Sequence, residues 1–183
     1  MSVGASEFPG LSVAPEMELA RATVASGVDL QAVETSLLYI RAAGATLTLF
    51  DRVFRRHGVS IGKFNMLLTI AAFSLPNAGH AFPKPAQIAH RLGVRRPTVT
   101  GLLDNLEKDG LVERSPHATD GRALRVELTK KGRRLLDKLL PEYWALTESM
   151  AGSLSHAERT GLLRGVEKVY ELLPALLGDD VEH

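Results

Sequence analysis

Two arginines and two threonines stand close together at the start of one predicted helix. The segment consists of Arg95, Arg96, Pro97, Thr98, Val99 and Thr100. Proline is favoured in the first turn of a helix, where its missing N–H would have no partner. Guanidinium groups bind phosphates and guanine edges, and hydroxyl groups bind bases or phosphates, so this segment has the chemistry of a DNA-binding surface. Arginines at a helix start are also common as solvated side chains, so the surrounding elements must decide.

A shorter predicted helix, residues 85–92, precedes this segment and ends at Gly93, and the longer helix runs from Pro97 to Asp109. Two helices joined by a tight turn form a helix-turn-helix, whose second helix enters the major groove by its N-terminal end. An apolar stripe on the second helix, formed by Val99, Leu102, Leu103 and Leu106, anchors it to the core. We expect its DNA contacts to be Arg95, Arg96, Thr98, Val99, Thr100 and Asn105.

After Gly110 the apolar period changes from helical to alternating. Residues 111–114 and 124–128 alternate apolar with charged side chains, and turn-forming residues lie between them, which predicts a β-hairpin. The tip of such a wing would carry Asp120 and Arg122. We expect Arg122 to enter the adjacent minor groove and Asp120 to hold a basic side chain in position by a charge-assisted hydrogen bond.

The charge of the chain is concentrated in one internal segment. The 183 residues carry a net charge of only +1, but residues 84–134 hold 12 Lys and Arg against 6 Asp and Glu, and the remainder holds 10 against 15. This basic segment is the footprint expected of a phosphate-facing surface, although a solvated charged face would look similar. The chain contains no cysteine, which excludes disulfides, thiolate metal sites and thiol-based redox sensing.

The remaining periodicity predicts helices before and after this segment. A short helix over 15–25 is followed by helices over 29–56 and 60–73, and two more over 130–151 and 155–177, the last introduced by a Ser155–Glu158 capping box. The expected fold is therefore mainly α with a small β-hairpin wing (α+β), a winged helix-turn-helix lobe joined to a helical region. The predicted organisation is a flexible N-terminal extension (1–28) and one domain (29–178), with the winged lobe at 60–129 and the helical region at 29–56 and 130–178.

The stretch from Pro85 to Leu136 resembles the core of the MarR (multiple antibiotic resistance regulator) family. The resemblance rests on a Gly-Leu-Val-Glu-Arg strand, an Asp-x-Arg wing and a Leu-Thr-x-x-Gly helix start, at Gly110–Arg114, Asp120–Arg122 and Leu128–Gly132. Family wings often carry two consecutive arginines, and Gly121 replaces the first here. The resemblance implies a homodimeric bacterial transcriptional regulator on a pseudo-palindromic double-stranded operator.

The same resemblance implies a dimer formed by the first long helix and the last two helices. Independently, these helices carry more apolar residues than one small body can bury, including Leu37, Leu38, Leu162, Leu163, Val166, Val169, Leu172, Leu173 and Leu176. Two recognition helices would then lie roughly 34 Å apart, which matches half-sites one helical turn apart.

The resemblance also implies release from DNA when a small aromatic ligand, often phenolic or carboxylate-bearing, settles between the dimer helices and the DNA-binding lobe. The residues expected to line such a crevice are Tyr39, Phe50, His57, Phe64, Asn65 and Met66, and simple core packing is the alternative for each. The N-terminal extension resembles that of the urate-responsive subgroup. That subgroup's acidic residue and ligand arginine stand here as Asn65 and Gly101, which argues against urate.

Two other classes of protein make different demands on the sequence. An enzyme would need a catalytic constellation, and the sequence has no Gly-x-Ser-x-Gly elbow, no phosphate-binding glycine loop and no paired histidines, so neither catalysis nor a metal or cofactor is expected. A helical interaction module with a vestigial wing would show no salt-dependent DNA affinity and no dependence on Arg122. The N-terminus does not resemble a signal peptide and the longest apolar run, 42–50, is too short to span a membrane, so a cytoplasmic location is expected.

Overall fold

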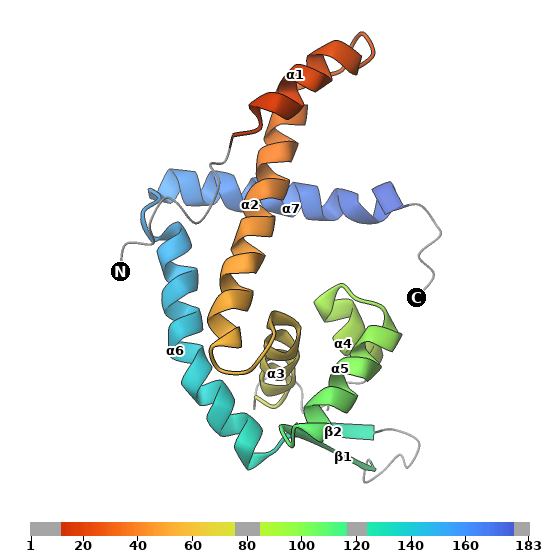
Figure 1. Ribbon diagram of the computed structural model, residues 1–183, viewed down its shortest axis with the longest axis vertical. Helices are drawn as coiled ribbons and strands as arrows, with labels where there is room; N and C mark the ends of the chain where they lie inside the picture. Colours follow the sequence, from red (N-terminus) through yellow and green to blue (C-terminus); the bar gives the residue numbers. More distant parts are fainter. Residues whose placement is uncertain (1–11, 76–84, 117–123, 178–183) are drawn as a thin grey trace. The chain divides into compact units, whose positions relative to one another are not determined.

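The computed structural model describes residues 12–75, 85–116 and 124–177. Within these ranges the chain is mostly helical with a single two-stranded hairpin (Figure 1), which confirms the predicted fold class. The chain forms two compact units, residues 1–61 and residues 62–183, which are described in turn. Among the described helices, none combines the length and the apolar composition that crossing a bilayer requires.

The first unit consists of two helices, α1 (Ala14–Thr23) and α2 (Leu30–Arg55). Asp29 caps α2, because its carboxylate accepts hydrogen bonds from two backbone N–H groups of the first turn at 2.9 and 3.2 Å. Helix α1 lies along the start of α2 (Figure 1), where Arg41 donates to the Glu16 carboxylate at 2.5 Å. An ion pair therefore joins α1, which lies within the predicted N-terminal extension (1–28), to α2.

Asp51 links the end of α2 to the start of α3 (Ile61–Phe73). Its carboxylate accepts from the backbone N–H of Ile61 at 3.0 Å and from the Arg55 side chain at 2.5 Å. These hydrogen bonds favour the ionised form, the one from Ile61 most, and lower the pKa of Asp51 below its ordinary value. Asp51 thus satisfies a backbone donor that would otherwise be unpaired at a helix start.

The second unit holds the helix-turn-helix, formed by α4 (Pro85–Leu92) and α5 (Arg96–Lys108), which pack against each other. Gly93 in the turn has a φ of +62°, a left-handed conformation that glycine adopts without steric cost. The buried side chains of this region come from α3, α4 and α5, as the helical periodicity predicted, and include Phe64, Leu67, Ile70, Ile88, Leu103 and Leu106.

The hairpin consists of β1 (Val112–Pro116) and β2 (Leu124–Leu128), paired antiparallel with Val112 opposite Leu128. The first strand was predicted to begin at Leu111 and to end at Arg114. It begins one residue later, because the Leu111 N–H donates to the Leu106 carbonyl at 2.9 Å and so still closes α5. It also ends two residues later, at Pro116, and Leu111 and Val112 are both buried. The predicted alternation is confirmed in β2, where Val126 and Leu128 are buried and Arg125 and Glu127 are only partly buried.

Helix α6 (Lys130–Gly152) starts directly after the hairpin. Thr129 caps it, with the side-chain oxygen accepting from the Gly132 N–H at 3.0 Å, while the Thr129 N–H donates to the Leu111 carbonyl at 3.1 Å. A Cβ atom on Gly132 would overlap that same carbonyl oxygen. The Leu-Thr-x-x-Gly motif therefore reflects a close approach of two backbones, which only glycine permits.

Helix α7 (His156–Leu177) begins with the predicted capping box. The Ser155 N–H donates to the Glu158 carboxylate at 2.7 Å, and the Glu158 N–H donates to the Ser155 hydroxyl at 3.3 Å. The hydroxyl and amide of Ser155 both stabilise the carboxylate, which lowers the pKa of Glu158. Both hydrogen bonds of the predicted capping box are therefore present.

Candidate DNA-binding site

The start of α5 presents its polar side chains to solvent. Arg95 is the N-cap residue, with an extended backbone (ψ 150°) and no capping hydrogen bond from its side chain, and Pro97 lies in the first turn. Arg95, Arg96 and Thr98 are all exposed. Two guanidinium groups and a hydroxyl are thus presented together at the positive end of a helix dipole, an arrangement suited to phosphate.

Val99 lies on the buried face of α5, which removes it from the expected DNA contacts. It is fully buried, as are Leu103 and Leu106, which lie four and seven residues further along the helix and therefore on the same face. Val99 was expected both to anchor the helix and to contact DNA. Only the anchoring role is compatible with its burial.

Thr100 and Asn105 are both exposed but differ in what they can offer. The Thr100 hydroxyl donates to the Arg96 carbonyl at 3.2 Å, so its oxygen remains available as an acceptor while this bond persists. Asn105 lies seven residues after Thr98, hence on the same face of the helix and about 10 Å further along its axis. The two side chains therefore share a face of α5 but are well separated along it.

Arg114 on β1 holds the hairpin against the recognition helix. Its Nη2 lies 2.6 Å from the Asp104 carboxylate and its Nε lies 3.6 Å from the Glu107 carboxylate, both on α5. The Arg114 side chain is mostly buried, at 21% exposure. This single guanidinium offsets part of the negative charge of two carboxylates on α5 and fixes the base of the wing relative to that helix.

The C-terminal end of α5 is held by further polar contacts around Asp109. Lys63 on α3 pairs with the Asp109 carboxylate at 2.6 Å, and Lys131 on α6 donates to the Asp109 carbonyl oxygen at 2.7 Å. The Thr129 hydroxyl also donates to the carbonyl oxygen of Gly110 at 2.7 Å. The recognition helix is therefore tied to α3 and α6 at one end and leaves its other end exposed.

Sequence reasoning did not identify Arg114 or Lys63 as positioning residues. Each ion pair joins two different elements, so the periodicity of a single helix does not reveal it. The available signal was charge: Asp104, Glu107 and Asp109 are acidic residues on an otherwise basic segment, in which many lysines and arginines could pair with them.

The structure describes some of the remaining predicted residues and not others. Asp120 and Arg122 lie in 117–123, outside the described residues, so their roles stay predictions. Among the expected ligand contacts, Phe64 and Met66 have no exposed surface and Phe50 has little, whereas Tyr39, His57 and Asn65 are at least partly exposed. A ligand could touch Phe64 or Met66 only after neighbouring side chains moved. Within the described ranges, no cluster of histidine and acidic side chains could hold a metal ion.

A helix-turn-helix with an exposed cationic start, followed at once by an antiparallel hairpin, defines the class of winged helix-turn-helix DNA-binding proteins. The comparisons with known proteins agree. The family model described as MarR family matches residues 77–124. The transcriptional regulator PecS of Dickeya dadantii (strain 3937) is 31% identical over 121 residues, which cover 64% of this chain and 70% of PecS. The transcriptional repressor YetL of Bacillus subtilis (strain 168) is 27% identical over 148 residues, covering 81% of this chain and 86% of YetL.

Solved structures show the same fold. FabT of Streptococcus pneumoniae in complex with DNA superposes with a TM-score of 0.62 at 27% identity, covering 81% of this chain and 99% of FabT. MosR of M. tuberculosis in complex with DNA gives a TM-score of 0.59 at 28% identity, over 75% of this chain and 94% of MosR. The chain belongs to the MarR family of winged helix-turn-helix transcriptional regulators, a family of DNA-binding proteins and not of enzymes.

Proposed function

We propose that the protein is a cytoplasmic, homodimeric repressor that binds an inverted-repeat operator and is released by a small aromatic or phenolic ligand. The DNA-binding part of this proposal rests on the exposed start of α5, where Arg95, Arg96 and Thr98 face solvent. Repression is supported by similarity to YetL, which is named as a repressor.

The proposed DNA contacts follow from position on α5 and in the wing. Arg95 and Arg96 bind phosphates or guanine edges at the mouth of the major groove, and Thr98, Thr100 and Asn105 face base edges along it. In the wing, Arg122 enters the minor groove and Asp120 orients a basic side chain. Val99 is removed from this set because it is buried.

Exposed apolar side chains on α7 support the dimer. Leu162, Leu163, Leu172 and Leu176 are each more than half exposed. A continuous series of large apolar residues on one helix is unfavourable in water and is typical of a subunit interface. We therefore assign residues 29–56 and 130–178 to dimerisation, residues 60–129 to DNA binding and residues 1–28 to an extension.

DNase footprinting of the region upstream of the protein's own gene tests this proposal, followed by fluorescence anisotropy on the protected duplex. We expect an inverted repeat to be protected and affinity to fall steeply with salt. Arg122→Ala should weaken binding and reduce the log-log salt slope by about one unit. An unchanged slope would exclude Arg122 from the minor groove, and binding indifferent to both salt and sequence would exclude the regulator assignment.

A further inference from the structure

Gly101 lies near the middle of α5, on the face that carries the proposed base contacts. It follows Thr98 by three residues and precedes Asn105 by four, so the three residues share one side of the helix and all are exposed. Val99 and Leu103 hold the opposite side in the core. A glycine inside a helix is less favourable than an alanine, because it loses more backbone freedom on folding. Gly101 therefore makes α5 less stable than it could be.

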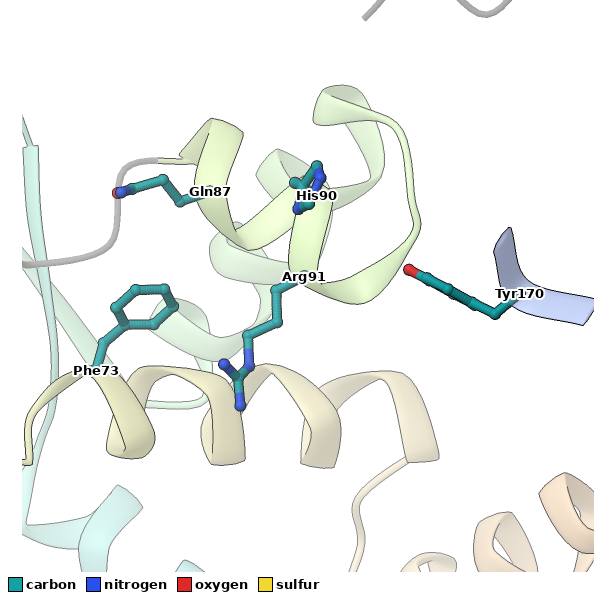
Figure 2. A pocket seen from close by; sticks show the side chains of 5 residues that line it. All are labelled: Phe73, Gln87, His90, Arg91 and Tyr170. Carbon is teal, nitrogen blue, oxygen red and sulfur yellow. The ribbon is translucent and has the colours of Figure 1, made fainter. Parts of the chain in front are cut away.

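Within the described part of the chain, none of the usual reasons for a helical glycine applies to Gly101. It is not among the glycines with a positive φ, so an alanine could adopt its backbone conformation. A Cβ atom on Gly101 would meet no described atom within 4 Å, whereas one on Gly132 would overlap the Leu111 carbonyl oxygen. Nor does Gly101 open onto the pocket of about 550 Å³ beside α4, which is lined by Phe73, Gln87, His90, Arg91 and Tyr170 (Figure 2).

The dimensions of a helix and of DNA give this position a different significance. A helix with its side chains is about 10–12 Å across and the major groove is about 12 Å wide, so a recognition helix enters the groove with little clearance. The side chains on its groove-facing side limit how deep the helix can lie, and a glycine there permits close approach of the backbone to a bound molecule. Thr98 and Asn105 have short side chains, so they reach base edges only if the backbone comes close.

We propose that Gly101 is the point of closest approach between α5 and the base edges of the operator. Its missing side chain lets the helix lie deep enough for Thr98 and Asn105 to contact bases. Gly101 is therefore a specificity-determining position, because it acts on the base contacts and not on the phosphate contacts of Arg95 and Arg96 at the helix start. The inference rests on the proposed function, which places this face of α5 in the major groove.

The alternative is that Gly101 is a surface glycine that the fold merely tolerates. Both interpretations predict that Gly101→Ala stabilises the free protein, because alanine is the better helix former and its methyl group has open space. Only the groove interpretation predicts that this more stable variant binds the operator less tightly. Opposite changes in stability and in specific binding therefore separate the two interpretations.

The test compares full-length wild type, Gly101→Ala and Gly101→Leu by urea unfolding and by fluorescence anisotropy on the footprinted duplex and on a scrambled duplex. We expect both variants to unfold at a higher urea concentration than the wild type. Affinity for the footprinted duplex should fall about tenfold with alanine and further with leucine, while affinity for the scrambled duplex changes less than about threefold. The matched control is Gly62→Ala on α3, whose Cβ would make an ordinary contact with the Leu102 side chain at 3.6 Å and which should bind both duplexes as the wild type does.

Three results would overturn the proposal: wild-type operator affinity in Gly101→Leu, equal losses of affinity on the two duplexes, or destabilisation of the free protein by Gly101→Ala. The last would show that the glycine is required for folding. A wild type that prefers the footprinted duplex, with variants that bind it equally well, would refute the role of Gly101 and leave the proposed function intact. A wild type without any preference between the duplexes would refute the proposed function, and the role of Gly101 with it.

Discussion

Replacing Arg114 by glutamine removes the ion pairs between the wing and the recognition helix and leaves a shorter, neutral but still polar side chain. A hydrogen bond to a charged partner contributes about 1.5–3 kcal/mol, and a fully exposed ion pair at most about 1 kcal/mol. Arg114 is 21% exposed, but Asp104 is 47% and Glu107 is 44% exposed, so solvent screening reduces the larger figure. We expect a coupling of about 1 kcal/mol between Arg114 and Asp104.

The same free energy should appear in DNA binding. In the wild type the wing is already positioned against α5, whereas in Arg114→Gln the wing must become ordered when DNA binds, which lowers affinity. The unpaired carboxylates on α5 would also repel the DNA phosphates. About 1 kcal/mol corresponds to about a fivefold loss of operator affinity. Arg133→Gln removes the same charge at an exposed site on α6 and should lose less.

The assay is a double-mutant cycle of Arg114→Gln and Asp104→Asn, with urea unfolding for stability and fluorescence anisotropy for operator binding. A coupling of about 1 kcal/mol in unfolding and partial recovery of operator affinity in the double variant would support the account. Additive effects within about 0.3 kcal/mol, or wild-type affinity in Arg114→Gln, would show that the ion pair does not position the wing.

Three further changes have definite expected outcomes. Gly132→Ala should destabilise the protein by about 2–3 kcal/mol in urea unfolding, because the new methyl group meets the Leu111 carbonyl. The control Gly161→Ala places its methyl group in open space and should stabilise the protein by up to about 1 kcal/mol. Equal effects of the two substitutions would contradict the close approach at Gly132. The pKa of Glu158 is lowered in the folded state, so its stabilising contribution is present above the ordinary glutamate pKa of about 4.3 and lost as pH falls. Glu158→Gln should therefore flatten the acid limb of stability against pH, and an unaltered limb would show that the capping box does not matter. Leu172→Glu should give a soluble monomer in analytical ultracentrifugation with little affinity for the inverted repeat, whereas a fully active dimer would remove α7 from the interface.

Most element boundaries were predictable because their signals are local. Asp29, Thr129 and Ser155 each precede an apolar helical pattern and each caps the helix that follows. The start of β1 was missed by one residue because the last turn of α5 competes for Leu111 through a backbone hydrogen bond that no side-chain pattern encodes.

The site was predictable only in part, for a related reason. Helical periodicity identifies the exposed start of α5, and applied strictly it also places Val99 on the buried face with Leu103. Contacts between distant elements carry no such signal. The Arg114 ion pairs with α5 and the pocket between α4 and α7 arise from tertiary packing, so only the structure reveals them.

The salt dependence of operator binding tests most directly whether the exposed start of α5 binds DNA. Fluorescence anisotropy over a range of KCl concentrations would compare the wild type with Arg95→Gln, Arg96→Gln and the double variant on the footprinted duplex and on a scrambled duplex. We expect the wild type to prefer the footprinted duplex, and each arginine that binds phosphate to contribute about 0.9 to the log-log slope. A double variant that retains both the affinity and the slope of the wild type would contradict the assignment of this helix to DNA.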